Sequence, residues 1–160
     1  MNAFPPEVER VATVLRAEAV EARIEEFESG TPTARDAAEA VGCELSQIVK
    51  SLVLVCDGAY VMALVPGDQR ANERAVGVAV PAELVRVARP EEVRHATGFE
   101  PGGVAPFPQR AITLTLMDQS LLRHDIVWVG AGTSSHMAAL APADLMRLTR
   151  ARGVDLAPHG

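Results

Sequence analysis

The residue whose type stands out in this sequence is Lys50. It is the only lysine among 15 basic residues, because the other 14 are arginine. In a chain with this bias, arginine serves wherever a general positive charge is enough. Lysine is retained where a compact ammonium is needed that a wide, planar, permanently charged guanidinium cannot replace. Lys50 is therefore a candidate functional group, and the alternative is an ordinary surface lysine that escaped the bias.

The position of Lys50 supports the same interpretation. Residues 48–56 form a near-continuous apolar run, which predicts a strand buried on both faces. Side chains alternate along a strand, so Lys50 shares a face with Leu52 and Cys56. Burying an unpaired ammonium is costly. Lys50 must therefore reach solvent at the strand end, pair with a carboxylate, or bind an anionic ligand.

A second candidate is the glycine- and proline-rich segment 97–107, Thr-Gly-Phe-Glu-Pro-Gly-Gly-Val-Ala-Pro-Phe. Pro101 and Gly102 suit the centre of a type II turn, and Gly103 leaves the backbone bare beside it. Glycines let a ligand approach main-chain N–H groups closely. The segment is predicted to be either a stiff set of backbone donors or a plain tight connection before the next strand.

The remaining motifs are weaker. The segment from Gly130 to His136 has neither the ending of a P-loop nor the third glycine of a dinucleotide-binding fingerprint. His136 either lines a pocket or is a hydrogen-bonded structural histidine. Ser134 and Ser135 beside it do not make a catalytic triad, since adjacent residues rarely place a base on a nucleophile. The four histidines lack metal-ligand spacing, so no metal site is expected.

Composition limits the class of protein. The 160 residues, 48% of them hydrophobic, fit one domain spanning 1–160. There is no apolar run of about 20 residues to cross a membrane and no secretory signal in the first ten residues. Cys43 and Cys56 fit a reducing cytoplasm. The net charge of −6 excludes a broad basic surface for nucleic acid, but not a small local one.

The pattern of apolar and turn residues predicts that the elements positioning these residues form one α+β domain around a mixed sheet. Apolar periodicity and caps predict helices that start at Pro6, Thr33, Asn72, Pro90 and Pro142, the last of which runs to Arg152. Asp57-Gly58 predicts a hairpin turn after the buried strand. Further strands are predicted at 24–27 (closed by Ser29-Gly30), 60–65, 84–88, 112–117 (one face buried), 126–129 and 137–140.

Several of these segments together resemble a known family. They are the stretch from Thr33 through Ile-Val-Lys-Ser-Leu (48–52), Val-Pro-Gly-Asp-Gln-Arg (65–70), and the loop at 97–107. They are similar to the YbaK / prolyl-tRNA-synthetase-associated editing superfamily, over roughly residues 6–150. The resemblance implies a YbaK-like editing fold, with a barrel-like mixed sheet flanked by helices. It also implies hydrolysis of wrongly charged aminoacyl-tRNA, here by a free-standing protein acting in trans.

By family analogy, Lys50, Gly102 and Gly103 are the catalytic residues, holding the reacting end of the substrate and offering backbone donors. Ala105 departs from the Ser or Pro of many relatives, which leaves the loop geometry open. The candidate substrate-binding residues are Leu52, Tyr60, Met62, Arg70, Val104, Pro106 and His136. The implied partner is the CCA end of aminoacyl-tRNA, with a synthetase as an optional second partner. No cofactor, metal or membrane is expected, and the protein is expected to be a cytoplasmic monomer or weak homodimer.

Two other functions remain open at this point. One is a non-catalytic aminoacyl-tRNA or nucleotide binder that kept the pocket, and the other is a hydrolase of another small aminoacyl ester. The residues do not say which amino acid is removed, because discrimination by pocket size is worth only about 1–3 kcal/mol per methylene. Alanine, cysteine, serine, threonine and a non-protein amino acid all remain candidates.

Overall fold

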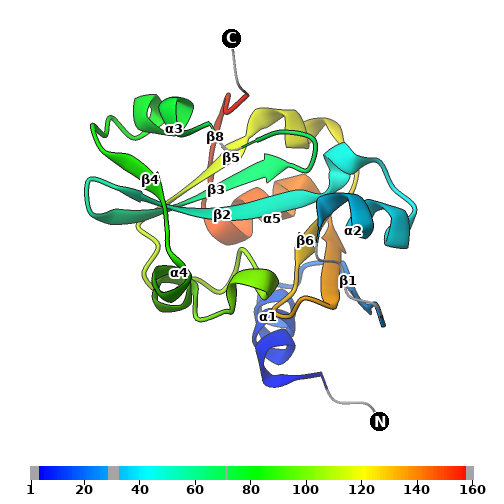
Figure 1. The fold of residues 1–160 in the computed structure, drawn as a ribbon. Helices are drawn as coiled ribbons and strands as arrows, with labels where there is room; N and C mark the ends of the chain where they lie inside the picture. The colour runs from blue at the N-terminus through cyan, green and yellow to red at the C-terminus, as the bar shows by residue number, and fades with distance from the viewer. Residues whose placement is uncertain (1–3, 29–32, 71, 158–160) are drawn as a thin grey trace.

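The computed structural model describes residues 4–28, 33–70 and 72–157. Its strands form two sheets, which Figure 1 shows together with the helices around them. The larger sheet has the order β4-β2-β3-β5-β8, and the smaller has the order β1-β7-β6. The strands are β1 (Ala22–Glu26), β2 (Val49–Cys56), β3 (Ala59–Pro66), β4 (Val85–Val87), β5 (Leu114–Asp118), β6 (Val127–Gly130), β7 (His136–Leu140) and β8 (Arg152–Val154).

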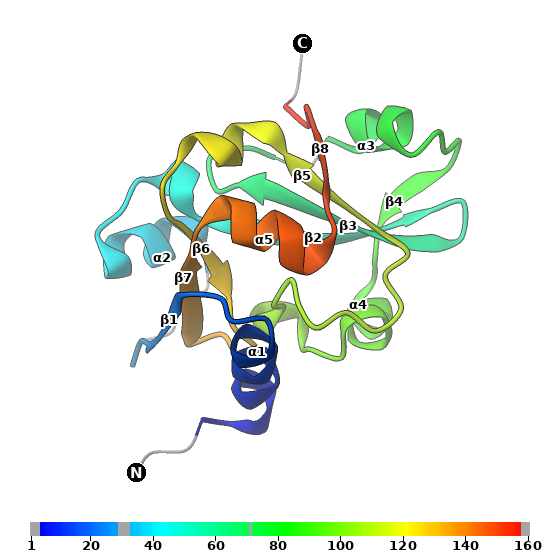
Figure 2. The same ribbon diagram turned by 180° about the vertical axis from the view of Figure 1, so that it is seen from behind.

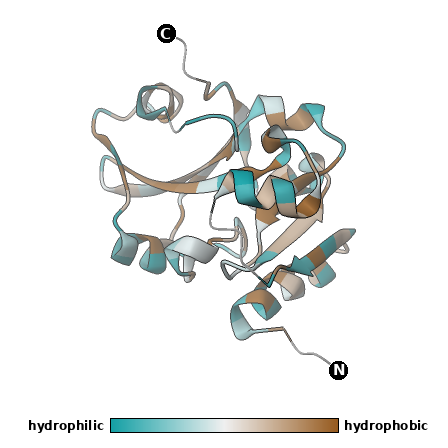
Figure 3. Ribbon diagram, turned by 45° about the vertical axis from the view of Figure 1, so that its right-hand side comes forward, coloured by the Kyte–Doolittle hydropathy of each residue, from teal (hydrophilic) through white to brown (hydrophobic). Residues whose placement is uncertain are grey.

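The β2–β3 hairpin is the centre of the larger sheet. The two strands pair from Val49 with Pro66 to Cys56 with Ala59, and the turn is the predicted Asp57-Gly58. Their alternate residues enter two separate apolar clusters, so the hairpin is buried on both faces over most of its length. In Figure 3 much of this hairpin is brown, the colour of hydrophobic residues, and teal, hydrophilic stretches lie on the helices around it.

The mixed, helix-flanked sheet expected from the sequence is confirmed, but the sheet is not closed into a barrel. In the described residues, the ladders of the two sheets meet only at an isolated parallel bridge between Ile48 and Trp128. A third apolar cluster, which contains both residues, fills the space between β6, β7 and the helix over Ala34–Val41.

Five α-helices pack around the sheets: α1 (Pro6–Ala17), α2 (Ala34–Val41), α3 (Glu73–Ala79), α4 (Pro90–Thr97) and α5 (Pro142–Thr149). Helix α5 lies over the five-stranded sheet in the view of Figure 2. Three short 3-10 helices, η1 (Leu45–Gln47), η2 (Pro101–Gly103) and η3 (Gln119–Arg123), connect the other elements. The predicted caps are present: the Thr33 hydroxyl accepts from the Asp36 N–H at 3.0 Å, and α2 ends at Gly42 in the left-handed conformation.

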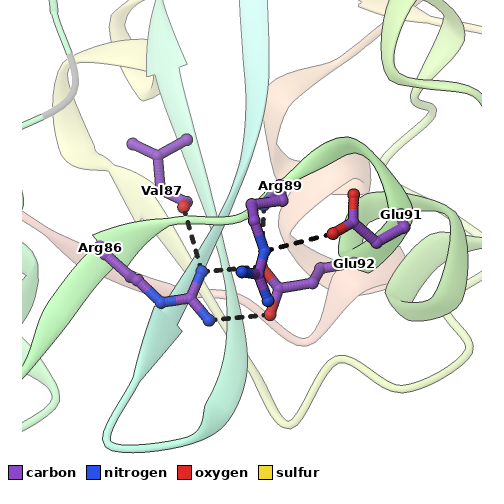
Figure 4. Close-up of polar contacts among 5 residues, drawn as sticks. All are labelled: Arg86, Val87, Arg89, Glu91 and Glu92. Atoms are coloured by element: carbon purple, nitrogen blue, oxygen red, sulfur yellow. Dashed lines mark hydrogen bonds and ion pairs between the residues drawn. The ribbon is translucent and has the colours of Figure 1, made fainter.

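An ion pair fixes the start of α4 to the edge strand β4. Both oxygens of Glu92 accept from the Arg86 guanidinium, at 2.7 and 2.8 Å, and the Arg89 N–H donates to the same carboxylate at 2.9 Å (Figure 4). These bonds stabilise the charged form and lower the pKa of Glu92 to about 2. The junction between β4 and α4 is thereby held in place.

Three predictions about local structure were wrong. Gly102 is not in the left-handed region that a type II turn requires, and Pro101–Gly103 instead form η2. The closing helix ends at Thr149, and Arg152 belongs to β8. Strand β5 is buried on both faces, since Thr115 is only 2% exposed. The predicted turn at Ser29-Gly30 lies outside the described residues.

Candidate functional site

The segments that carry the sequence motifs meet at one cleft of ≈ 380 Å³. It lies between the first half of β2, the N-terminal turn of α2, η2 and the start of β7. Its lining residues are Thr33, Ala34, Ala37, Ile48, Val49, Lys50, Ser51, Leu52, Pro101, Gly102, Val104, Gly130, Thr133, His136 and Met137.

The cleft lies where one edge of β2 is left unpaired, between the ladder with β4 and the bridge from Ile48 to Trp128. Strand β4 pairs with Leu54–Cys56 alone, and its bond nearest the cleft runs from the Ala88 N–H to the Val53 carbonyl. Backbone groups alternate between the two edges of a strand, so the N–H and C=O of Ser51 point to this same edge. Lys50 and Ser51 point to opposite faces, and both line the cleft, which therefore reaches around the open edge of β2.

The ammonium of Lys50 is half-buried and is held by the loop after β3. It donates a hydrogen bond to the backbone carbonyl of Gln69. Burial lowers the pKa of Lys50 below its ordinary value of 10.5, the nearby Asp68 carboxylate opposes this, and Arg70 adds to it. An ammonium has three N–H donors. Two remain to act on a bound group after the bond to Gln69.

Ser51 is a second residue with a polar side chain that lines the cleft. Its hydroxyl oxygen is buried, and no protein group in the described structure bonds to it. Buried hydroxyls are normally hydrogen-bonded because leaving one unpaired costs free energy. The motif Lys-Ser thus places two residues with polar side chains at one cleft, a partly desolvated lysine and a serine whose hydroxyl is buried without a partner. The sequence analysis did not single out Ser51, although it is a polar residue within an apolar strand.

The two glycines of η2 have different environments. Gly102 is exposed and borders the cleft, and a Cβ added there would have only the Ser134 Cβ nearby, at 3.9 Å. Gly103 is buried, and a Cβ added there would lie 2.7 Å from the Thr133 Cα. The Gly103 N–H already donates to the Glu100 carbonyl at 2.8 Å. Gly103 is therefore a packing position under η2, and the expectation that its N–H is a free donor is wrong.

His136 is held on both sides of its ring. Its Nδ1 lies 2.6 Å from the hydroxyl of Thr133, and its Nε2 lies 3.0 Å from a carboxylate oxygen of Glu26 on the neighbouring strand β1. The side chain is only 4% exposed. A carboxylate can only accept, so the Nε2–H donates to Glu26 and the Thr133 hydroxyl donates to Nδ1 in the neutral ring. His136 thus forms a fixed wall of the cleft.

Glu26 and Thr133 were missed by the sequence analysis. Thr133 lies within a motif that was examined, but Glu26 meets His136 only through the pairing of β1 with β7, in which the two residues are direct partners. No spacing in the sequence indicates this pairing.

The structure brings some of the predicted site residues together and separates others. Lys50, Gly102, Leu52, Val104 and His136 all line the cleft. The others lie elsewhere. Met62 is fully buried in the main core, Pro106 is buried and accepts from Gln109, Tyr60 packs near the His95 ring, and Arg70 is exposed beside Lys50.

A larger cavity, of ≈ 560 Å³, lies between α3 and the end of the chain described, lined by residues such as Ala75 and Val154. None of the motif residues lines it, so volume alone does not identify the site. In residues 4–28, 33–70 and 72–157, no group of three or more His, Cys, Asp or Glu is arranged to hold a metal ion. No helix in that part of the chain is long and apolar enough to span a membrane.

Comparison with known proteins places this geometry in a family. Residues 28–148 match the model of the aminoacyl-tRNA editing domain. The chain is 32% identical over 127 residues to the uncharacterized protein YwhH of Bacillus subtilis, covering 76% of this chain and 78% of that protein. It is 31% identical over 140 residues to the proline–tRNA ligase of Acidithiobacillus ferrooxidans. That match covers 81% of this chain but only 24% of the ligase, so the chain spans about a quarter of that relative's length.

Among solved structures, one crystal structure of a protein proposed to be a trans-editing enzyme for prolyl tRNA synthetase superposes with a TM-score of 0.91. It is 35% identical, and the match covers 98% of this chain and 100% of the other. Taken with the family match and the cleft built from the Lys-Ser strand and η2, these likenesses show that the chain belongs to the aminoacyl-tRNA editing domain family.

Proposed function

We propose that this protein hydrolyses mischarged aminoacyl-tRNA in trans, cutting the ester bond to the 3′-terminal adenosine. The observation that supports the proposal is the position of Lys50, a half-buried lysine that lines the same cleft as Gly102 and Ser51. The family match and the likeness to a proposed trans-editing enzyme support this activity and this class of substrate.

The chemistry follows from the groups present. Water attacks the ester carbonyl, and negative charge develops on its oxygen. A desolvated ammonium with free donors stabilises such charge, and pre-positioned donors do so without reorganising during the reaction. The bond from Lys50 to Gln69 holds the ammonium in place. The alcohol released is a ribose hydroxyl, which takes up the proton lost by the attacking water.

No protein base is assigned to activate the water. His136 has both ring nitrogens engaged by Thr133 and Glu26, so it presents no free acceptor to the cleft. A ribose hydroxyl of the substrate can position the water instead. The protein then acts mainly by orientation and by charge stabilisation, which together provide large rate accelerations.

The first test is deacylation of a panel of labelled aminoacyl-tRNAs by the wild-type protein and by Lys50→Ala, with no metal added. We expect release of one or two mischarged amino acids by the wild type and a loss of at least about 100-fold in Lys50→Ala, as for removal of an oxyanion donor. Lys50→Arg is expected to lose most activity although the charge is kept, because the guanidinium is wider and planar.

The matched control is Arg74→Lys, the reverse exchange at an arginine outside the cleft, which should leave the rate unchanged. A wild-type rate in Lys50→Arg would contradict the role given to the ammonium. Binding of charged tRNA without hydrolysis would show that the protein is a non-catalytic aminoacyl-tRNA-binding protein. Hydrolysis of free aminoacyl esters in preference to charged tRNA would point to another small ester as substrate.

A further inference from the structure

Two arginine side chains that the proposed reaction does not use converge on one small surface. Gly98 ends α4 in the left-handed conformation, and a Cβ added to it would lie 2.7 Å from the Arg110 Cζ and 2.8 Å from the Arg10 Nη2. The two guanidinium groups therefore lie side by side over Gly98, although they come from α1 and from the segment before β5. Figures 1 and 2 both place α1 and α4 at the lower side of the molecule.

Arg10 is fixed in place before anything binds. Its Nη1 donates to the Gly98 carbonyl at 2.8 Å, and its guanidinium lies 4.4 Å above the centre of the Phe99 ring. The backbone beside Arg110 is also anchored, since the Ala111 N–H donates to the Ala96 carbonyl at 2.9 Å. Ordering a long side chain costs conformational entropy, and a pre-positioned one has less to lose on binding.

Neither guanidinium has a carboxylate partner in the described residues. The nearby Glu100 carboxylate is taken by Arg94 at 2.7 Å. The arginines that do form ion pairs are Arg16, Arg23, Arg86, Arg89, Arg94 and Arg147. Two like charges held together without a counter-ion repel each other, and an anion between them relieves that repulsion. Guanidinium pairs suit phosphate in particular, because their planar forks bind its oxygens in pairs.

The pair lies within reach of the cleft. Gly98 precedes Gly102 by four residues, which an extended chain spans in about 14 Å at most. Helix α1 also adjoins the cleft wall, since a Cβ on Gly132, next to Thr133, would lie 2.7 Å from the Glu7 carbonyl oxygen. A strand of RNA whose last nucleotide occupies the cleft would have its preceding phosphates at about this distance.

We propose that Arg10 and Arg110 form a clamp for the phosphates of the tRNA acceptor strand just before the terminal adenosine. The proposal rests on the function proposed above and specifies how the substrate's RNA part is held. It assigns the small local basic site that a net charge of −6 leaves possible. It also predicts that the clamp contributes to recognition of tRNA but not to the chemistry at the ester.

The test compares two substrates that carry the same amino acid: charged tRNA and a 3′-aminoacyl adenosine without phosphates. Arg110→Ala should lower kcat/KM for charged tRNA roughly tenfold, as expected for a lost charged hydrogen bond. The slope of log kcat/KM against log salt should fall by about one. Arg110→Glu should have a larger effect, and neither variant should change kcat/KM for the adenosine ester.

Arg110 is the cleaner position because its exposed side chain makes no bond that holds the fold together in the described residues. The matched control is Arg16→Ala, on the same helix as Arg10, whose guanidinium is already paired with Glu9 at 2.7 Å. An equal loss on both substrates, or no loss on tRNA, would overturn the clamp. If the wild type hydrolyses neither substrate, the clamp is tested by measuring the binding of an uncharged acceptor-stem RNA. Weaker binding by Arg110→Glu than by the wild type would support the clamp, and equal binding would overturn it.

Discussion

At the scale of single residues, the site depends on where an ammonium can be kept charged while partly out of water. The apolar strand β2 desolvates Lys50, the Gln69 carbonyl orients it, and the Asp68 carboxylate partly offsets the effect of burial on its pKa. The bias toward arginine in the sequence singled out this residue, and in the structure it lines the cleft. The neighbouring Ser51 was missed because its significance comes from having no partner in the fold, which no sequence pattern reveals.

The lowered pKa of Lys50 makes a prediction about pH. The ammonium is needed for the reaction, so enzymatic kcat/KM, corrected for spontaneous ester hydrolysis, should fall as pH rises, with a midpoint below 10.5. The same group should make folding stability rise with pH between its folded pKa and 10.5, because the unfolded chain binds the proton more tightly there. A pH–rate profile and urea unfolding at matched pH values test both statements. A rate that stays level to pH 10.5 would contradict the first.

At the scale of elements, the edge of β2 and the turn η2 create the cleft between them. The apolar run 48–56 and the Asp57-Gly58 turn predicted the β2–β3 hairpin, because a long apolar strand and a hairpin dipeptide are strong local signals. Strand β8 was missed because it has three residues, one of them glycine, and exists only through pairing with β5. The unpaired stretch of β2 was equally unpredictable, since it depends on how short β4 is and on the bridge to Trp128.

The two glycines of η2 give a matched pair of substitutions. Gly103→Ala should destabilise the fold by about 1–3 kcal/mol, because its Cβ would collide with the backbone of Thr133 and Gly132. Gly102→Ala should leave stability within about 0.5 kcal/mol, as surface substitutions usually do. Gly102→Val should fold and lose activity, because its side chain would stand at the rim of the cleft. Thermal unfolding and deacylation of the same preparations check these expectations, and an unfolded Gly102→Val would reassign Gly102 to a structural role.

At the scale of the whole molecule, a chain with a net charge of −6 is proposed to act on a polyanion. A negatively charged protein can act on tRNA if its contacts with the RNA are limited to the end of the acceptor strand. In the proposal one ammonium acts at the ester and one pair of arginines contacts the acceptor strand, while six other arginines of the described residues are paired with carboxylates. Such a protein has little affinity for RNA in general, because non-specific binding comes from many phosphate contacts.

The central claim is that the cleft beside Lys50 holds the aminoacyl end of the substrate. The most direct measurement is amide chemical-shift mapping with an amide-linked aminoacyl adenosine, which binds but resists hydrolysis. We expect shifts confined to residues 50–52, 102–104 and 133–137, around the cleft. Shifts at Ala75, Ala79 and Val154, with the cleft residues unchanged, would place the ligand in the larger cavity beside α3 and contradict the account.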